Sequence, residues 1–210
     1  MKIIVAGASG LVGGEVVAQA DALGVESTLV GRRSLGEGER EIITDFGSAI
    51  ELPPADAAIC TLGTTIAKAG SRRAFYAVDH DAVMTFAESA LAANIPHFLV
   101  VTAIGADAKA PVYYSRVKGE VERSLEGLGF RRLDIAQPGL LLGSREERRP
   151  MEALFQAANP LVRRLLVGPL DRYAGIEAAV VAEALLGLCA SDMEPGVFRH
   201  ENRQLRLIAA

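Results

Sequence analysis

The chain opens with the sequence MKIIVAGASGLVG (residues 1–13), and this stretch indicates its fold class. Lys2 to Ala6 is a short apolar run typical of a buried strand, and Leu11 to Leu23 carries apolar residues at helical spacing. Between the two runs, Gly7, Gly10 and Gly13 recur every third residue. A glycine-rich turn that binds nothing is the alternative interpretation. The order strand, turn, helix favours a dinucleotide-binding βαβ unit instead.

The three glycines of this turn have different expected roles. Gly7 allows the tight turn, Gly10 lets the backbone approach a pyrophosphate, and Gly13 lets the helix and strand pack closely. Backbone N–H groups at the start of the helix would then face the negative phosphates. The predicted cofactor contacts here are Gly7, Ser9, Gly10, Leu11, Val12 and Gly13.

Short strand-like runs alternate with longer helical stretches through the first two thirds of the chain. We expect strands at 2–6, 27–30, 41–44, 56–61, 97–102 and 133–137, and helices at 11–23, 72–93 and 112–128. Strands that alternate with helices form right-handed βαβ units and a parallel sheet. The sequence therefore predicts an α/β fold with a doubly wound parallel sheet of the Rossmann type.

After Gly143 this alternation stops. We expect helical segments near 151–158, 161–166 and 175–190, and a weak strand at 204–208. We interpret residues 1–210 as a single NAD(P)-binding domain, in which 144–210 form a small helical C-terminal appendage on the substrate side. The charged segment 145–149 would either cover the substrate side or form a solvated loop.

The composition limits the classes of molecule that this chain is expected to bind. The 210 residues are 50% hydrophobic and carry a net charge of -4, whereas a general nucleic-acid binder usually has a basic surface. We see no membrane segment, and the partner that we expect is a small-molecule substrate, with a protein partner also possible. Cys60 and Cys189 have no metal-site spacing and form no disulfide framework, which favours a reduced, cytoplasmic setting without a metal.

The end of the second strand indicates which dinucleotide is bound. Sites that prefer NAD usually carry an acidic residue there, about 20 residues after the glycine turn. This chain has Arg32 and Arg33 instead, and guanidinium groups can pair with the 2′-phosphate of NADPH. The alternative is that both are ordinary surface charges. Asp45-Phe46, after the third strand, is a weaker candidate for a contact beside the adenine.

Tyr114 and Lys118 lie four residues apart at the start of an expected helix and so share one face. A nearby ammonium group lowers the pKa of a phenol, which would help Tyr114 donate a proton to a carbonyl oxygen. Lys118 would also hold the nicotinamide ribose. The alternative is a half-buried tyrosine beside a solvated lysine. Their place at the C-terminal edge of the sheet, where ligands bind in such folds, favours function.

Together, the glycine turn and the Tyr114/Lys118 pair resemble the short-chain dehydrogenase/reductase superfamily. Further motifs narrow the resemblance to its atypical branch, the one that is like the HIV-Tat-interacting oxidoreductase. These motifs are Leu62-Gly63-Thr64-Thr65, Lys68-Ala69-Gly70, Val78-Asp79, His97-Phe98, Gly105-Ala106-Asp107, Val117-Lys118-Gly119-Glu120-Val121-Glu122, Pro138-Gly139 and the run from Gly143 to Pro150. The resemblance covers most of the chain and is most specific between Cys60 and Pro150.

The resemblance implies a Rossmann-type fold and an NADPH site that includes Arg32 and Arg33. It also implies cofactor contacts from Leu62, Gly63 and Thr64, and from Pro138 beside the nicotinamide. Enzymes of the superfamily use a Ser or Thr after the fifth strand to orient the substrate carbonyl. Either Thr102 or Ala103 occupies that position here, and in the second case the catalytic triad is incomplete.

These observations predict an NADPH-dependent oxidoreductase acting on a small carbonyl substrate, with Tyr114, Lys118 and Thr102 as catalytic residues. The alternative is a regulatory or sensor protein that binds NADPH with little or no turnover. A sugar-nucleotide epimerase is disfavoured, because such enzymes need a larger substrate domain than the residues after Gly143 supply. No Ser–His–Asp arrangement is expected, and His97 is interpreted as structural.

Overall fold

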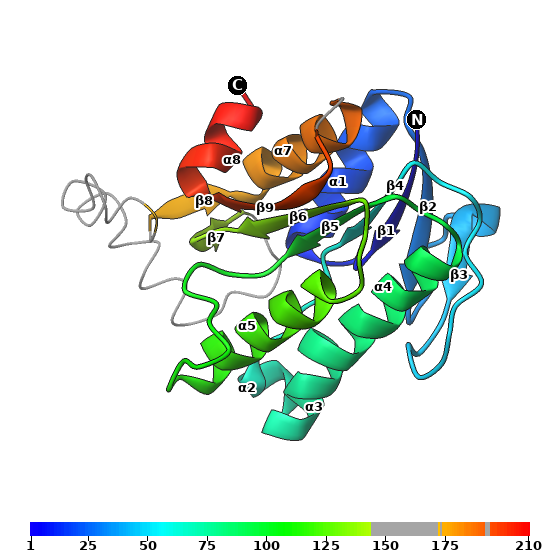
Figure 1. Ribbon diagram of the computed structural model, residues 1–210. Coiled ribbons are helices and arrows are strands. Elements are labelled where there is room, and N and C mark those ends of the chain that lie inside the picture. The colour runs from blue at the N-terminus through cyan, green and yellow to red at the C-terminus, as the bar shows by residue number, and fades with distance from the viewer. Residues whose placement is uncertain (144–171, 173, 192–193) are drawn as a thin grey trace.

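A parallel sheet of seven strands forms the centre of the computed structural model, which describes residues 1–143, 172, 174–191 and 194–210 (Figure 1). The order of its strands is β3-β2-β1-β4-β5-β6-β9. Their bounds are β1 (Lys2–Ala6), β2 (Glu26–Gly31), β3 (Glu41–Ile43), β4 (Ala57–Cys60), β5 (His97–Val101), β6 (Arg132–Gln137) and β9 (Gly196–Glu201). Two further strands, β7 (Leu140–Leu142) and β8 (Gly175–Glu177), pair separately.

Helices cover both faces of the sheet (Figure 1). One face carries α1 (Leu11–Ala22), α7 (Ala178–Ala190) and α8 (Asn202–Ile208), and the other carries α4 (Ala82–Ala92) and α5 (Tyr113–Glu126). Each face has its own buried hydrophobic cluster, because alternate strand residues such as Ile3 and Ile4 point to opposite sides. The predicted doubly wound Rossmann-type sheet is confirmed.

The order of the strands reverses between β1 and β4, which both pair with parallel neighbours. From β1 the chain adds β2 and β3 on one side, and then returns to add β4, β5 and β6 on the other. In doubly wound folds, ligands bind beyond the carboxyl ends of the strands at such a switch point. This arrangement places the turn after β1, residues 7–10, at the position where a ligand is expected.

The expected helix at 72–93 is divided into three parts. It consists of α3 (Arg72–Tyr76), the π-helical segment η2 (Ala77–Asp81) and α4. Short helices occur before it, at α2 (Ile66–Ala69), and before β3, at the 3-10 turn η1 (Gly38–Arg40). Single π-helical turns inside an α-helix occur frequently at functional sites, because the extra residue changes which side chains face inward.

The end of the chain differs from the expectation in two respects. Strand β9 pairs in parallel with β6 along its whole length and so extends the main sheet, where we expected no strand. The weak strand expected at 204–208 is wrong, since these residues lie in α8. Leu205 is fully buried and Ile208 packs beside it on the same core, whereas Leu207 is 69% exposed. This is helical spacing rather than alternation.

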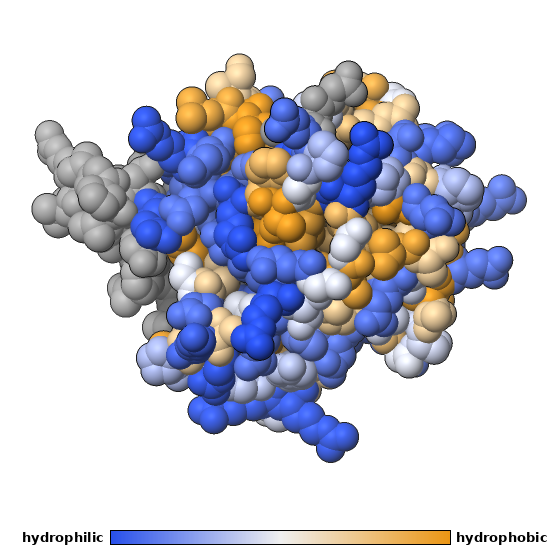
Figure 2. Space-filling view, viewed as in Figure 1, coloured by the Kyte–Doolittle hydropathy of each residue, from blue (hydrophilic) through white to orange (hydrophobic). Residues whose placement is uncertain are grey.

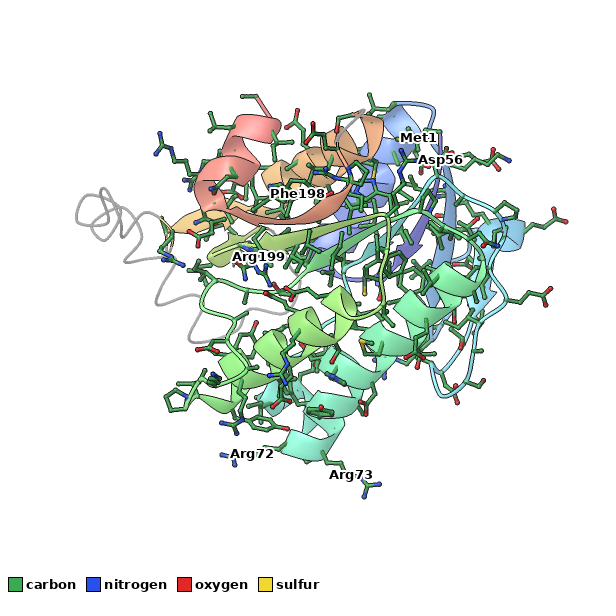
Figure 3. All side chains as sticks on the ribbon, in the orientation of Figure 1. Met1, Asp56, Arg72, Arg73, Phe198 and Arg199 are labelled. Atoms are coloured by element: carbon green, nitrogen blue, oxygen red, sulfur yellow. The ribbon has the colours of Figure 1, made fainter. Side chains whose placement is uncertain are left out.

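Strand β9 lies at an edge of the sheet, and Phe198 and Arg199 on it are labelled in Figure 3. Seen from the same side, the surface is hydrophilic over much of this face, with hydrophobic residues gathered over β9 (Figure 2). The helices expected near 151–158 and 161–166 and the charged segment 145–149 lie outside the described residues. Within the part that is described, no helix is long and apolar enough to cross a membrane.

Candidate functional site

A cavity of about 430 Å³ lies at the switch point, beyond the carboxyl ends of β1, β2 and β4. Eight of the predicted cofactor residues line it: Gly7, Ser9, Gly10, Arg32, Arg33, Asp45, Leu62 and Gly63. They come from four separate loops, and the topology of the sheet brings these loops to one edge. The cavity has the volume of a small-molecule or cofactor site and the position that doubly wound folds use for one.

The glycine turn leaves no room for side chains at two of its positions. Gly7 has φ +92°, a left-handed conformation that favours glycine, and a Cβ atom there would lie 2.7 Å from Thr61 Oγ1. A Cβ atom on Gly13 would lie 2.2 Å from the carbonyl oxygen of Gly7, so this glycine permits close packing of α1 on the turn. The turn therefore has the shape that close approach of a phosphate group to the backbone requires.

Leu11 and Val12 follow the turn, and their side chains pack into the core rather than line the cavity. Their possible contribution to binding is limited to the backbone N–H groups at the N-terminal end of α1. These N–H groups have no carbonyl partner within the helix, which makes them suitable for an anion.

Arg32 and Arg33 line the cavity where the chain leaves β2, and both side chains are exposed. Neither guanidinium group has an ion-pair partner among the residues that the structure describes. The loop after them is held by Glu41, which accepts hydrogen bonds of 2.5 Å from Ser34 Oγ and from the backbone N–H of Leu35. These hydrogen bonds lower the pKa of Glu41, so it remains negatively charged at the wall of the cavity.

Asp45 and Phe46 line the cavity beside the arginines. Asp45 Oδ1 accepts a hydrogen bond of 2.8 Å from the N–H of Gly47. Phe46 is buried and has φ +63°, which is unusual for a bulky residue. The sequence offered Phe46 only together with Asp45, as a weak candidate for a place beside the adenine, because nothing in the sequence distinguishes a left-handed phenylalanine from an ordinary core residue.

The segment after β4 connects the cavity to the buried part of the site. Leu62 and Gly63 line the cavity, and the N–H of Thr64 donates a hydrogen bond of 2.9 Å to Asp79 Oδ2. A Cβ atom on Gly63 would lie 3.5 Å from Lys118 Nζ. The ammonium group of Lys118 is therefore directly behind the wall of the cavity.

Tyr114 and Lys118 both lie on α5, as expected from their spacing. Lys118 is buried, and its Nζ lies 2.8 Å from Asp79 Oδ1. Burial alone lowers the pKa of Lys118, but the attraction of Asp79 and of the Tyr114 phenol outweighs it, so the net shift is upward. The Tyr114 ring packs against Phe75 on α3, with the ring centroids 5.7 Å apart. The structure thus places the tyrosine near the lysine, and the lysine against the cavity wall.

Thr102 follows β5, and no contact within the described residues joins it to Tyr114. Its hydroxyl donates a hydrogen bond of 2.6 Å to Glu122 Oε1, and only 6% of the residue is exposed. Glu122 also accepts hydrogen bonds of 2.9 Å and 3.0 Å from Gln137 Nε2 and pairs with Arg199, which reaches from β9 toward α5 (Figure 3). The Thr102 hydroxyl therefore belongs to a buried network that joins α5 to three strands.

Pro138 is buried and does not line the cavity. Its carbonyl oxygen accepts a hydrogen bond of 3.0 Å from the N–H of Ile104. The next residue, Gly139, donates its N–H to Asn202 Oδ1 at 2.8 Å, and a Cβ atom there would lie 2.5 Å from the carbonyl oxygen of Ala174. Contacts from α8 and from the segment before β8 therefore fix this turn.

Two of the three histidines lie in a buried cluster around Asp134 on β6. Asp134 accepts hydrogen bonds from His97 Nε2 at 2.7 Å, His200 Nε2 at 2.6 Å, and Arg132 Nε and Nη2 at 2.6 Å and 2.9 Å. The contact agrees with the structural interpretation of His97. Across the described residues, no group of three or more His, Cys, Asp or Glu side chains is arranged to hold a metal ion.

The third histidine forms an arrangement that we did not expect. His80 Nδ1 lies 2.9 Å from Asp81 Oδ1, and His80 Nε2 lies 3.4 Å from Ser124 Oγ. This is the order of a Ser–His–Asp relay, but Ser124 lies inside α5, where its N–H takes part in the helix and cannot stabilise an oxyanion. The His80 ring also stacks on Tyr76 at 4.5 Å. We therefore assign the relay no catalytic role.

Curated proteins with similar sequences identify the relatives of this chain, although no family model matches it. Protein HTATIP2 of Rattus norvegicus is 42% identical over 137 residues, covering 60% of this chain and 56% of that protein. The mitochondrial protein fmp52 of Emericella nidulans is 44% identical over 96 residues, covering 46% and 41%. The chain is a homologue of HTATIP2 and fmp52. The alignments span about half the length of these curated relatives.

Solved structures agree with this relationship at the level of the fold. The human epimerase family protein SDR39U1, solved with NADPH, has a TM-score of 0.71 at 20% identity, covering 96% of this chain and 74% of that one. A UDP-N-acetylglucosamine 4-epimerase from Bacillus cereus has a TM-score of 0.70 at 17% identity, covering 100% and 82%. This homologue of HTATIP2 and fmp52 thus has the same Rossmann-type fold as these solved proteins.

Proposed function

We propose that this chain is an NADPH-dependent oxidoreductase that acts on a small carbonyl compound. One observation carries the proposal: Lys118 Nζ lies directly behind Gly63, which lines the same cavity as Arg32 and Arg33. A dinucleotide that extends from the arginines across the glycine turn would bring its nicotinamide end toward Lys118. Tyr114 then stands on the same face of α5, one turn before the lysine.

When bound, the reduced nicotinamide supplies a hydride to the carbonyl carbon of the substrate. Tyr114 donates the phenolic proton to the carbonyl oxygen, so that the carbonyl becomes an alcohol, and water restores the proton. The charged ammonium group of Lys118 favours the phenolate that remains and contacts the ribose. The glycine turn and the first N–H groups of α1 bind the pyrophosphate.

The preference for NADPH over NADH is part of the proposal. Arg32 and Arg33 are exposed at the cavity and have no ion-pair partner within the described residues, so both are available to a 2′-phosphate. Charge-assisted hydrogen bonds of guanidinium to phosphate are among the strongest in proteins. NADPH is present in the SDR39U1 structure, whereas the MoeE5 structure with UDP-glucose contains NAD, so the fold itself accommodates either cofactor.

Oxidation of NADPH in the presence of a panel of aldehydes, ketones and quinones tests the proposed activity. For a compound that the wild type reduces, Tyr114→Phe is expected to lower kcat by about 10²–10⁴-fold, the usual contribution of a general acid. The matched control is Tyr113→Phe on the neighbouring residue, whose hydroxyl donates to the carbonyl oxygen of Arg72. Turnover by Tyr114→Phe at the wild-type rate would show that Tyr114 is not the proton donor.

A second candidate function is an NADPH-binding regulatory protein with little or no turnover. The observation that favours it is the hydrogen bond of the Thr102 hydroxyl to Glu122, because a hydroxyl engaged in this way is not free to orient a carbonyl group. Tight NADPH binding without oxidation across the whole panel would support this candidate. Turnover of any carbonyl compound that depends on Tyr114 would exclude it.

A cytoplasmic location remains a proposal. Cys60 and Cys189 are both free thiols, which suits a reducing compartment. The fungal relatives named fmp52 carry the word mitochondrial in their names, which favours a different compartment for those proteins. Fractionation of cells that express the full chain, with antibody detection in the cytosolic and mitochondrial fractions, distinguishes the two locations.

A further inference from the structure

Asp79 is a buried carboxylate that the proposed mechanism does not use. It lies in the π-helical segment η2, and none of its surface is exposed. Its neighbour His80 is partly buried against Ser124 of α5, whereas the side chain of the next residue, Asp81, is 60% exposed. The π-helical turn therefore directs one acid of this segment inward and leaves the other in solvent. An ionised group so deeply buried is costly unless it is paired.

Asp79 makes two contacts, one with the loop after β4 and one with α5. Its Oδ2 accepts the N–H of Thr64 at 2.9 Å, in the loop that lines the cavity, and its Oδ1 lies 2.8 Å from Lys118 Nζ on α5. A Cβ atom on Gly63 would lie 3.4 Å from Asp79 Oδ1 and 3.5 Å from Lys118 Nζ. The ion pair is thus packed directly against the cavity wall.

The ion pair is not saturated by hydrogen bonds. Although Oδ1 is close to the ammonium group, it receives no well-directed hydrogen bond within the described part of the chain. We treat the contact as an ion pair of poor hydrogen-bond direction, since the distance is short and the attraction does not depend on angle. A buried carboxylate oxygen without a directed donor is rare in native proteins and requires an explanation, of which a functional role is one.

The groups that face Lys118 determine its charge. They are Asp79 from η2, Tyr114 from its own helix, and the thiol of Cys60 at the end of β4. Burial raises the pKa of Cys60 to about 12, so this thiol is neutral at physiological pH. Asp79 is then the group that offsets the burial of Lys118, and without it burial would lower the pKa of this lysine.

We propose that Asp79 is a positioning residue of the site, whose carboxylate keeps the buried Lys118 charged and holds its ammonium group beside Gly63. The inference rests on the proposed function, because Lys118 is taken to contact the cofactor. Asp79 itself touches neither cofactor nor substrate in this account and acts through the lysine. A purely structural role, through the hydrogen bond from Thr64 alone, is the competing explanation.

The variant Asp79→Asn separates these two roles. The asparagine is nearly the same size and keeps a carbonyl oxygen for the N–H of Thr64, but it removes the negative charge. Asp81→Asn is the matched control, because it removes an exposed carboxylate two residues further along the same segment. The readout is the NADPH affinity between about pH 7 and about pH 9.5, measured by quenching or calorimetry without any substrate.

The wild type and Asp81→Asn are expected to bind NADPH with little dependence on pH, because Lys118 stays charged throughout. Asp79→Asn is expected to lose about tenfold in affinity toward the alkaline end, as a buried lysine without its counter-ion loses its proton. Lys118→Met is expected to bind weakly at every pH. A pH profile of Asp79→Asn that matches the wild type would overturn the proposal.

Two further measurements distinguish a wrong ion-pair proposal from a wrong proposed function and from a variant that does not fold. The ¹⁵N resonance of Lys118 Nζ, followed by NMR, is expected to titrate at lower pH in Asp79→Asn than in the wild type, and an unchanged titration would overturn the proposal. This readout needs no cofactor, so it still applies if the wild type fails to bind NADPH and the proposed function is wrong. If Asp79→Asn does not fold, the double variant Asp79→Asn/Lys118→Met should fold, and a double variant that remains unfolded would refute the ion-pair role.

Discussion

Asp79 and Asp134 are both fully buried carboxylates, but their surroundings differ. Asp134 accepts four hydrogen bonds from one arginine and two histidines, and both of its oxygens are satisfied. Asp79 has one lysine, one backbone N–H, and an oxygen without a directed donor. The first cluster is complete within the chain, as a structural network must be. The second lies against Gly63, in the wall of the cavity that Arg32 and Arg33 also line.

The same contrast separates the two ends of the strands. Near the beginnings of β5 and β6, His97 and Arg132 are paired inside the protein. At the carboxyl edge of the sheet, Arg32 and Arg33 are exposed and unpaired within the described residues. Charges that the chain satisfies itself stabilise the fold, and charges that it leaves open are available to a ligand. Changes in the two regions should therefore affect different measurements.

Asp134→Asn is expected to have the largest effect, and only on stability. It removes the counter-ion of Arg132, and breaking a buried ion pair costs about 3–5 kcal/mol. Hydrogen bonds from His200, His97 and Arg132 outweigh the effect of burial and hold the pKa of Asp134 well below its usual range. This contribution to stability is therefore present above about pH 4 and lost as pH falls further.

Urea unfolding of the wild type and Asp134→Asn at several pH values checks this expectation. The difference in free energy of unfolding should be constant near neutral pH and should narrow below about pH 4. The folded variant should still bind NADPH with the wild-type affinity. A variant of unchanged stability that binds NADPH poorly would reverse the contrast between the two regions.

The double variant Arg32→Ala/Arg33→Ala is expected to do the opposite. It removes two partners of a 2′-phosphate, so the affinity for NADPH should fall on the order of 100-fold, while that for NADH should change little. Stability should stay the same, because neither side chain contributes an ion pair to the described structure. Arg73→Ala on α3, whose side chain points outward in Figure 3, is the control. Equal losses of NADPH and NADH affinity, measured by calorimetry, would contradict the assignment.

Gly13→Ala tests whether the edge of the sheet is built for close approach. Its Cβ atom would lie 2.2 Å from the carbonyl oxygen of Gly7, and overpacking of this kind costs about 1–3 kcal/mol and would distort the turn. Gly14→Ala is the control, because its Cβ atom would meet nothing nearer than 3.5 Å and alanine favours a helix. Thermal unfolding and NADPH titration of both variants should show losses for Gly13→Ala alone.

Thr102→Val is expected to have the smallest effect on activity. The Thr102 hydroxyl donates to Glu122 within a satisfied network, so its loss should cost about 1.5–3 kcal/mol of stability. The turnover of a verified carbonyl substrate by the folded variant should stay within about threefold of the wild type. A fall in kcat of about 100-fold without loss of stability would instead identify Thr102 as the residue that orients the carbonyl.

Residue spacing and alternation in the sequence were sufficient to predict the fold, but they did not predict the buried networks around Asp79 and Asp134. The glycine spacing and the alternation of strands and helices correctly predicted the strands β1 to β6 along the chain and the doubly wound sheet, and the arginines, Leu62 and Gly63 do line one cavity. Asp79 was noted only as a point of resemblance, because its burial depends on a π-helical turn that leaves no mark in residue spacing. Strand β9 was missed because it lies at an edge of the sheet and its sequence, GVFRHE, contains only two large apolar residues.

A crystal structure of the chain with NADPH tests the central claim most directly. The account predicts the pyrophosphate on the turn of Gly7 and Gly10, the 2′-phosphate on Arg32 and Arg33, and the nicotinamide ribose beside Lys118, with its ion pair to Asp79 intact. A 2′-phosphate in contact with neither arginine, or a nicotinamide directed away from Tyr114 and Lys118, would contradict it.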